Sequence, residues 1–242
     1  MEMLKRVQRA LRNDVPLKAL RDLTNRFRYG PDAPLSDETV WLPLDRITHL
    51  YRPNPARGAP TLRRRHSGLV LDGDWHLSRK PLTVSEKEIS CRMRLIDGAP
   101  WEETPIWARH TREIAEGHRP DGCRTIDDLR AWYARRDAAF AEIRAAGQLT
   151  PMAALPEASR REHGGILVHI GPDDTYLRSG GGAHRFAVAR IFGFEFIPVQ
   201  VGAVHRDAVL SGAYARLHRG ITPPGQAAGR DLAASASKSL PV

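Results

Sequence analysis

The stretch that decides the fold runs from Thr175 to Val201 and reads TYLRSGGGAHRFAVARIFGFEFIPVQV. Its three consecutive glycines, Gly180 to Gly182, lack the Cβ atom that restricts other residues, so they predict a tight loop whose N–H groups can turn toward a ligand. The apolar run that follows, Phe186 to Phe192, predicts a helix, and Gly193 lies where a helix stop is expected. The loop therefore delivers the chain into the amino end of a helix.

A helix amino end attracts anions, because its unpaired N–H groups and the positive end of the helix dipole favour a phosphate. His184 and Arg185 in the first turn would add a titratable donor and a permanently charged, two-pronged one. An arginine in a first turn is also often only solvated, and short glycine motifs frequently occur without a ligand, so an ordinary loop stays open as the alternative. The candidate phosphate contacts are Gly180, Gly181, Gly182, His184 and Arg185.

The residues on both sides of the loop predict strands. Upstream, an apolar run from Ile166 to Ile170, a turn at Gly171 to Asp174 and a second run from Thr175 to Arg178 predict a hairpin. Downstream, Glu195 to Val201 predicts a further strand, in which Pro198 indicates an edge or bulge position because proline cannot donate a ladder hydrogen bond.

This succession of strand, turn, strand, GGGAHR, helix and I-P-V strand resembles the ParB/sulfiredoxin superfamily over about Gly165 to Ala203. Sulfiredoxins carry GGCHR at this junction, and ParB proteins carry a G-x-R-R version followed by a helix, a glycine and an I-P-V strand. The resemblance implies an α/β (α+β) fold with a small mixed sheet, and a loop that holds nucleotide phosphates, of ATP in sulfiredoxin and of CTP in ParB. It implies phosphate contacts from Gly181, Gly182, His184 and Arg185.

The departures from the family pattern restrict the chemistry. Ala183 stands where sulfiredoxin has its reactive cysteine, so the chain cannot act as a sulfiredoxin, whose nucleophile is a thiolate. About 40 residues follow Val201, which we expect to be too few for the helix-turn-helix domain of ParB proteins. A third branch of the superfamily phosphorylates free serine and needs a carboxylate base in place of the cysteine. That branch stays open, as does an inactive relative kept as a scaffold.

An earlier stretch, LPLDRITHLYRPNPARG from Leu42 to Gly58, resembles the opening strand of ParB-like domains, although Pro-Asn-Pro is also an ordinary turn sequence. If the resemblance holds, the fold is split and its two halves meet across more than a hundred inserted residues. The expected organisation is then a basic helical N-terminal region over 1–40, a domain over 41–220 with a helical insertion at about 100–150 and a core at 165–204, and a disordered tail over 221–242.

Asp72, Asp74 and His76 occupy alternating positions in LVLDGDWH and would share one face of an extended segment. Such a face could bind Mg²⁺ through Asp72 and Asp74, or supply a general base. A hairpin that turns at Asp-Gly, with Trp75 packed beneath it, accounts for the same residues without a function.

Glu102 and Glu103 follow Trp101 and offer a second carboxylate pair. A carboxylate beside an indole is desolvated and becomes a better proton acceptor for a substrate hydroxyl. The alternative is that both residues only complement the dipole of a helix expected from about Pro105 to Gly117.

Hydrophobic periodicity predicts further helices from about Pro16 to Tyr29, from Thr125 to Gly147 with Thr125 as its cap, and from about His205 to Arg219. A first helix would place Leu4, Val7 and Leu11 on one stripe. Cys91 and Cys123 lack metal-binding spacing, so we read them as reduced and structural, and the expected compartment is the cytosol. No apolar run approaches the roughly 18 residues of a membrane span.

The net charge of +9 is concentrated at the ends, and Met1 to His66 carries 14 basic residues against 7 acidic ones. The densest cluster, Arg63 to His66, could bind nucleic acid or an anionic membrane surface. A merely solvated surface is the alternative, because no aromatic residues interleave with the arginines for stacking on bases.

Two functions follow from these patterns. The first is a protein that binds nucleotide phosphates, of ATP or CTP and with Mg²⁺, and that could act as a phosphotransferase on a small hydroxyl compound. In that case the loop would neutralise phosphate charge and a carboxylate among Asp72, Asp74, Glu102 and Glu103 would accept the proton. The second is a non-enzymatic, ParB-like protein that is DNA-associated or responds to nucleotide.

Overall fold

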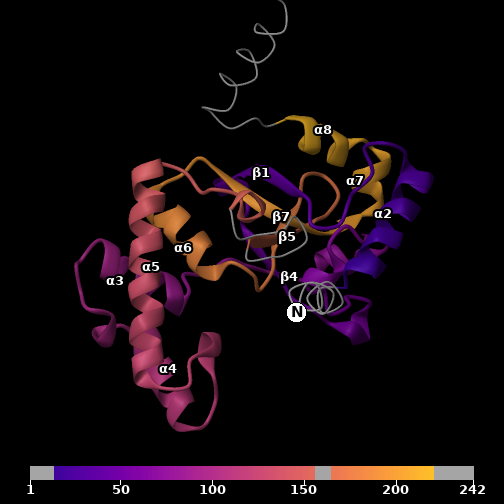
Figure 1. Ribbon diagram of the computed structural model, residues 1–242. Helices are drawn as coiled ribbons and strands as arrows, with labels where there is room; N and C mark the ends of the chain where they lie inside the picture. The colour runs from indigo at the N-terminus through magenta and orange to yellow at the C-terminus, as the bar shows by residue number, and fades with distance from the viewer. Residues whose placement is uncertain (1–13, 156–164, 221–242) are drawn as a thin grey trace, which may run out of the picture.

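A computed structural model describes residues 14–155 and 165–220 (Figure 1). They form an α/β fold around one mixed sheet with the strand order β1-β7-β5-β6-β2-β4, in which β3 also pairs with β7. The strands are β1 (Thr39–Pro43), β2 (His49–Tyr51), β3 (Val70–Leu71), β4 (Arg79–Pro81), β5 (Ile166–Ile170), β6 (Tyr176–Arg178) and β7 (Phe196–His205). The helices are α2 (Val15–Tyr29), α3 (Glu86–Leu95), α4 (Pro105–Ala115), α5 (Ile126–Ala146), α6 (Ala183–Phe192), α7 (Arg206–Leu210) and α8 (Ala213–Gly220).

The two halves of the sheet come from distant parts of the chain, as the split arrangement predicts. β1 pairs antiparallel with β7, and β2 pairs parallel with β6. The predicted hairpin is confirmed as the antiparallel pair β5 and β6. Helices α3, α4 and α5 lie between β4 and β5, where a helical insertion is expected at about 100–150, and this helical stretch begins earlier, with α3 at Glu86.

The edge position predicted at Pro198 is confirmed locally, because Pro198 pairs with Trp41 of β1 and has no partner in β5. β7 is an interior strand that pairs with β5 on one side and with β1 and β3 on the other. Proline is tolerated there because the ladder with β5 begins only at the next residue, Val199, which pairs with Ile166.

The irregularity of β7 lies instead at Gly202, where the register against β5 shifts. The fully buried ring of His169 occupies the space that a side chain at Gly202 would fill, and its Nδ1 accepts a hydrogen bond of 3.0 Å from the N–H of Ala203. Burial lowers the pKa of His169 to about 3, so the ring stays neutral and keeps the lone pair that this bond needs.

Helix α6 lies between two hydrophobic cores. Phe186 and Ala189 pack into the core of the sheet, whereas Ala187 and Val188 pack into a second core built by α3, α4 and α5. Figure 1 shows α6 between the long α5 and the sheet, with α2, α7 and α8 on the side away from α5. A helix covered on both sides needs apolar residues around most of its circumference, which accounts for the sequence FAVARIF.

Most helix predictions are confirmed. α5 has the expected cap, with the Thr125 side chain accepting from the N–H of Asp128 and the Asp128 carboxylate accepting from the N–H of Thr125, and Gly147 ends the helix in the left-handed region. The helix expected from His205 to Arg219 is wrong as a single element, because Gly212 with a φ of 73° divides it into α7 and α8. The expected first helix and the tail lie outside the described residues.

The two cysteines are free and buried in the second core, as predicted for structural residues. Burial raises the pKa of the Cys91 thiol to about 12. Within 14–155 and 165–220, no helix combines the length and the apolar character that crossing a bilayer requires.

The position of α6 between two cores predicts that added volume there is costly. Ala187→Leu should lower the free energy of unfolding by about 1–3 kcal/mol, because Ala187 is buried and three added carbon atoms would overpack its surroundings. The matched change Ala108→Leu, on the exposed side of α4, should stay within about 0.5 kcal/mol. Urea denaturation of both variants checks this, and equal midpoints would contradict the packing of α6 against the second core.

Candidate functional site

The glycine loop packs against the amino end of β5. Gly182 adopts the left-handed conformation, with φ 65° and ψ 31°, and forms the N-cap of α6. A Cβ atom on Gly182 would lie 2.7 Å from the backbone N and Cα of Ile166. Position 182 therefore requires glycine for two reasons: its backbone angles are left-handed, and β5 lies too close to leave room for a side chain.

The loop presents a row of unused donors. The first helical hydrogen bond of α6 runs from the N–H of Phe186 to the carbonyl of Gly182, at 2.9 Å. In the described part of the chain, the five N–H groups from Gly181 to Arg185 have no acceptor. Together with the positive end of the helix dipole, they form the anion-attracting arrangement that the sequence predicts.

Arg64, which the sequence analysis did not select for this site, lies directly beside the loop. It comes from a short 3-10 helix, Arg64–His66, and donates to the side-chain oxygen of Gln200 and, at 2.7 Å, to the carbonyl of Gly165. A side chain at Gly181 would collide with the Arg64 guanidinium, so this second glycine makes room for it. The expectation of a solvated cluster at Arg63 to His66 thus holds for the exposed Arg63 and Arg65 and fails for Arg64, which turns inward.

A chain of buried polar side chains holds Arg64 in place. The Gln200 amide donates to Asp37 at 3.1 Å, and Asp37 forms an ion pair of 3.0 Å with Lys18 of α2. Lys18, Asp37 and Gln200 are all buried. The loop is therefore linked through Arg64 to a helix at the opposite end of the described chain.

The side chain of His184 points toward α5, where its ring is buried and uncharged. Its ring meets Trp132 edge-on with centroids 5.2 Å apart, and the guanidinium of Arg136 lies 4.4 Å from the same indole ring. Burial, helped by the positive charges of Lys87 and Arg136, lowers the pKa of His184 to about 3. The imidazole is thus neutral at physiological pH, and of the two residues predicted in the first turn only Arg185 carries a permanent charge.

Two further arginines flank the start of α6. Arg185 donates to the carbonyl of Thr150 in the segment between α5 and β5, and burial lowers the pKa of Arg185 to about 10. Arg178 ends β6, and its guanidinium lies 4.8 Å from the centre of the Phe186 ring. Its buried Nε has no hydrogen-bond acceptor among the described residues, and burial lowers its pKa.

The arginines near the loop have no carboxylate bound to them among the described residues. Within residues 14–155 and 165–220, no carboxylate forms an ion pair with any of the four arginines near the loop, namely Arg64, Arg136, Arg178 and Arg185. Burying an unpaired charge is unfavourable, and an anion is the usual remedy.

The expected face of Asp72, Asp74 and His76 is wrong. β3 ends at Leu71, and Asp74 to His76 lie in a 3-10 helix, Asp74–Leu77, which turns successive side chains in different directions. Asp72 pairs with Arg206 at 2.6 Å. Trp75 is buried, as the alternative expects, but the expected hairpin is wrong, because β3 pairs with β7 and β4 pairs with β2.

This turn also lies at the wrong end of the sheet for a joint site with the loop. The carbonyl of Gly73 is 2.9 Å from the ring of His205, at the carboxyl end of β7, whereas Gly182 abuts Ile166, which pairs with Val199 near the amino end of β7. Six strand residues separate the two places, or about 20 Å. Asp72 and Asp74 therefore do not fit a Mg²⁺ ion held at the loop, and the described chain gathers no group of three or more metal-ligating side chains suited to a metal ion.

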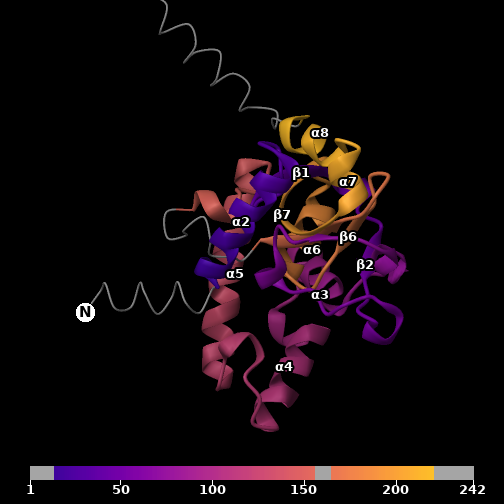
Figure 2. The same cartoon turned by 90° about the vertical axis from the view of Figure 1, so that its right-hand side faces the viewer.

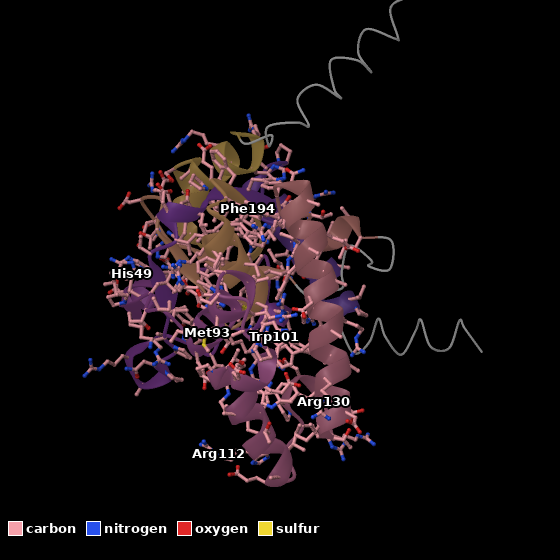
Figure 3. The ribbon with its side chains drawn as sticks, turned by 90° about the vertical axis from the view of Figure 1, so that its left-hand side faces the viewer. His49, Met93, Trp101, Arg112, Arg130 and Phe194 are labelled. Carbon is pink, nitrogen blue, oxygen red and sulfur yellow. The ribbon has the colours of Figure 1, made fainter. Side chains whose placement is uncertain are left out.

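Glu102 and Glu103 are exposed on a 3-10 helix, Trp101–Glu103, so the desolvation expected from Trp101 is absent. The indole N–H of Trp101 donates to Asp137 at 2.9 Å, and Glu102 pairs with Arg130 at 3.5 Å. Figure 3 shows Trp101 beside α5 and Arg130 on that helix. Both glutamates directly precede Thr104, whose side chain caps α4, so the alternative that they complement the dipole of this helix stays a prediction.

No protein-family model matches the chain, and neither a curated protein nor a solved structure matches it. The relation to the ParB/sulfiredoxin superfamily therefore stays a prediction from the residues between Gly165 and Ala203.

The requirement for glycine at position 182 is open to a direct test. Gly193→Ala, at a φ of 68° with nothing within 4 Å, should cost only the left-handed backbone penalty of about 1–2 kcal/mol. Gly182→Ala should cost more, because its methyl group would also overlap the backbone of Ile166. Chemical denaturation of the two variants measures the difference, and equal losses would contradict the close approach of β5.

The neutral state of His184 predicts a pH dependence of stability. The folded pKa of about 3 lies below the ordinary value of about 6.5, so between these values the unfolded chain binds a proton that the folded chain does not. The free energy of unfolding should therefore fall on acidification, by about 1.4 kcal/mol per pH unit for this group.

In His184→Gln, the contribution of His184 to the pH dependence of the free energy of unfolding should disappear, while the contribution of His169 remains. Urea unfolding between about pH 6 and pH 4 provides the comparison. An unchanged slope would mean that His184 is protonated in the folded protein.

Proposed function

We propose that the loop from Gly180 to Arg185 and the amino end of α6 bind the phosphate groups of a nucleotide of the ATP or CTP type. The observation that carries this proposal is the row of five N–H groups without an acceptor, set beside arginines that have lost water and have no carboxylate partner among the described residues. A phosphate would supply both missing interactions at once.

Three of the arginines near the loop have different roles in this proposal. The Nε–H of Arg64 has no acceptor among the described residues and lies beside Gly181, so it is available to a phosphate oxygen while the other two nitrogens hold Gln200 and Gly165. Arg178 approaches from β6 with its own Nε unused. Arg185 fixes the Thr150 segment that borders the loop, and the neutral His184 forms a wall against α5.

The proposal extends to binding and not to phosphotransfer. Asp72 and Asp74 lie about 20 Å from the loop by strand count, and Glu102 and Glu103 face solvent. None of the four predicted carboxylates therefore lies beside the bound phosphates in this proposal, which favours the nucleotide-responsive regulatory class over the phosphotransferase. Electrostatic stabilisation of phosphate by fixed donors is the chemistry that this chain's own residues supply.

The sharpest test places a negative charge in the loop without disturbing the helix. Ala183 is the first residue of α6, where an acidic side chain stabilises the helix dipole but repels phosphate. Calorimetric titration of ATP, ADP and CTP, with and without Mg²⁺, should show binding to the wild type and to Ala183→Asn. Affinity should fall by at least about tenfold in Ala183→Asp, a loss of about 1.4 kcal/mol or more.

Arg178→Ala should weaken binding in the same direction, whereas Arg130→Ala, on the exposed surface of α5, should not. Equal affinity of the Ala183→Asp and Ala183→Asn variants would contradict the proposal, as would the absence of binding to the wild type. Salt-sensitive binding of duplex DNA that Ala183→Asp leaves unchanged would support the DNA-associated alternative through the basic N-terminal third.

A further inference from the structure

Helix α2 carries its apolar residues on the outside. Four large apolar side chains of α2 are among the most exposed in the described chain: Leu17 at 63%, Leu20 at 62%, Leu23 at 67% and Phe27 at 93%. The residues that α2 buries are polar, namely Lys18, Asp22 and Asn25. At 100° per residue, the four exposed side chains fall within about a third of the helix circumference, so they form one continuous stripe.

Specific hydrogen bonds hold α2 in this orientation. Asp22 accepts from the N–H of Ser36 at 2.6 Å, and the Asn25 amide donates to the carbonyls of Pro34 and Gly68, each at 2.7 Å. The ion pair of Lys18 with Asp37 adds a buried contact on the same face. Rotating the helix to bury its leucines would break all of these bonds. The same bonds that hold α2 in place therefore keep its apolar stripe exposed.

The stripe has a positively charged border. Asp22 is the only acidic residue of α2, and it faces inward, whereas Arg26 and Arg28 are exposed beyond the stripe. Arg21 donates to the carbonyls of Arg65 and Ser67, which brings the segment carrying the exposed Arg63 and Arg65 next to the helix. An apolar stripe with basic residues at its border is the surface that interfacial helices offer to anionic lipid.

We propose that α2 docks on an anionic membrane surface, lying parallel to the bilayer with Leu17, Leu20, Leu23 and Phe27 in the headgroup region. Figure 2 shows α2 on the face of the molecule that is turned toward the viewer. A second copy of the chain is a poorer occupant, because the pairing of two α2 stripes would bring arginines into an interface to which neither helix contributes an exposed carboxylate. This inference does not depend on nucleotide binding.

Vesicle flotation of the full chain tests the docking surface. The wild type should float with phosphatidylcholine vesicles that contain phosphatidylglycerol and not with phosphatidylcholine alone, and added salt should weaken the binding. Leu23→Glu/Phe27→Glu should reduce the bound fraction by at least about tenfold, because two charges replace the inserting side chains. Leu77→Glu/Val84→Glu, exposed apolar residues outside α2, should bind as the wild type does.

The outcomes separate α2 from other sources of binding. Circular dichroism and urea midpoints should be unchanged in Leu23→Glu/Phe27→Glu, since both side chains are exposed. Residues 1–13 are identical in all variants, so undiminished flotation of the double variant would overturn the role of α2. A wild type that does not float would overturn the proposal, and sedimentation showing a dimer that the double variant dissociates would assign the stripe to a second copy.

Discussion

The ion pair between Lys18 and Asp37 is the interaction on which both candidate surfaces depend. Lys18 is only 1% exposed, and a buried lysine is stable as a cation only beside a negative charge. On one side the pair fixes which face of α2 points inward, and on the other Asp37 orients Gln200, which in turn holds Arg64 beside the glycine loop. One buried carboxylate therefore contributes both to the orientation of α2 and to the position of an arginine at the amino end of α6.

The second constraint is the double burial of α6. Because the sheet covers one side of this helix and the α3–α5 layer covers the other, α6 is held firmly in place between them. The amino end carries the free N–H groups, and strand β5 closes the loop from beneath. A rigid helix start of this kind supplies donors whose positions are fixed before a ligand arrives, which lowers the cost of ordering them on binding.

The sequence predicts well those features that depend on neighbours in the chain. The caps of α5, the β5–β6 hairpin and the glycine-to-helix junction follow from local patterns, and the structure contains all three. The prediction failed where a distant partner decides. Arg64 looked like one of four solvated residues in Arg63 to His66, and only its packing against Gly181 and Gly165 distinguishes it.

His184 illustrates the same limit, because its charge depends on burial against Trp132 of α5, about fifty residues earlier in the chain. Pro198 predicts an edge position, and it has a partner on one side only; that β7 is nevertheless an interior strand depends on β5, whose ladder begins at the next residue. The prediction that Asp72, Asp74 and His76 share one face failed for a local reason. Gly73 permits a turn into a 3-10 helix as readily as it permits a continued strand.

The contact between His169 and Gly202 joins two positions whose identities are not independent. The imidazole occupies the volume that any side chain at 202 would need, and the register shift of β7 depends on the bond that the same ring makes to Ala203. A larger residue at 202 is compatible with this strand only if residue 169 becomes smaller and the bulge is lost. In a set of related sequences, positions 169 and 202 should therefore vary as a pair.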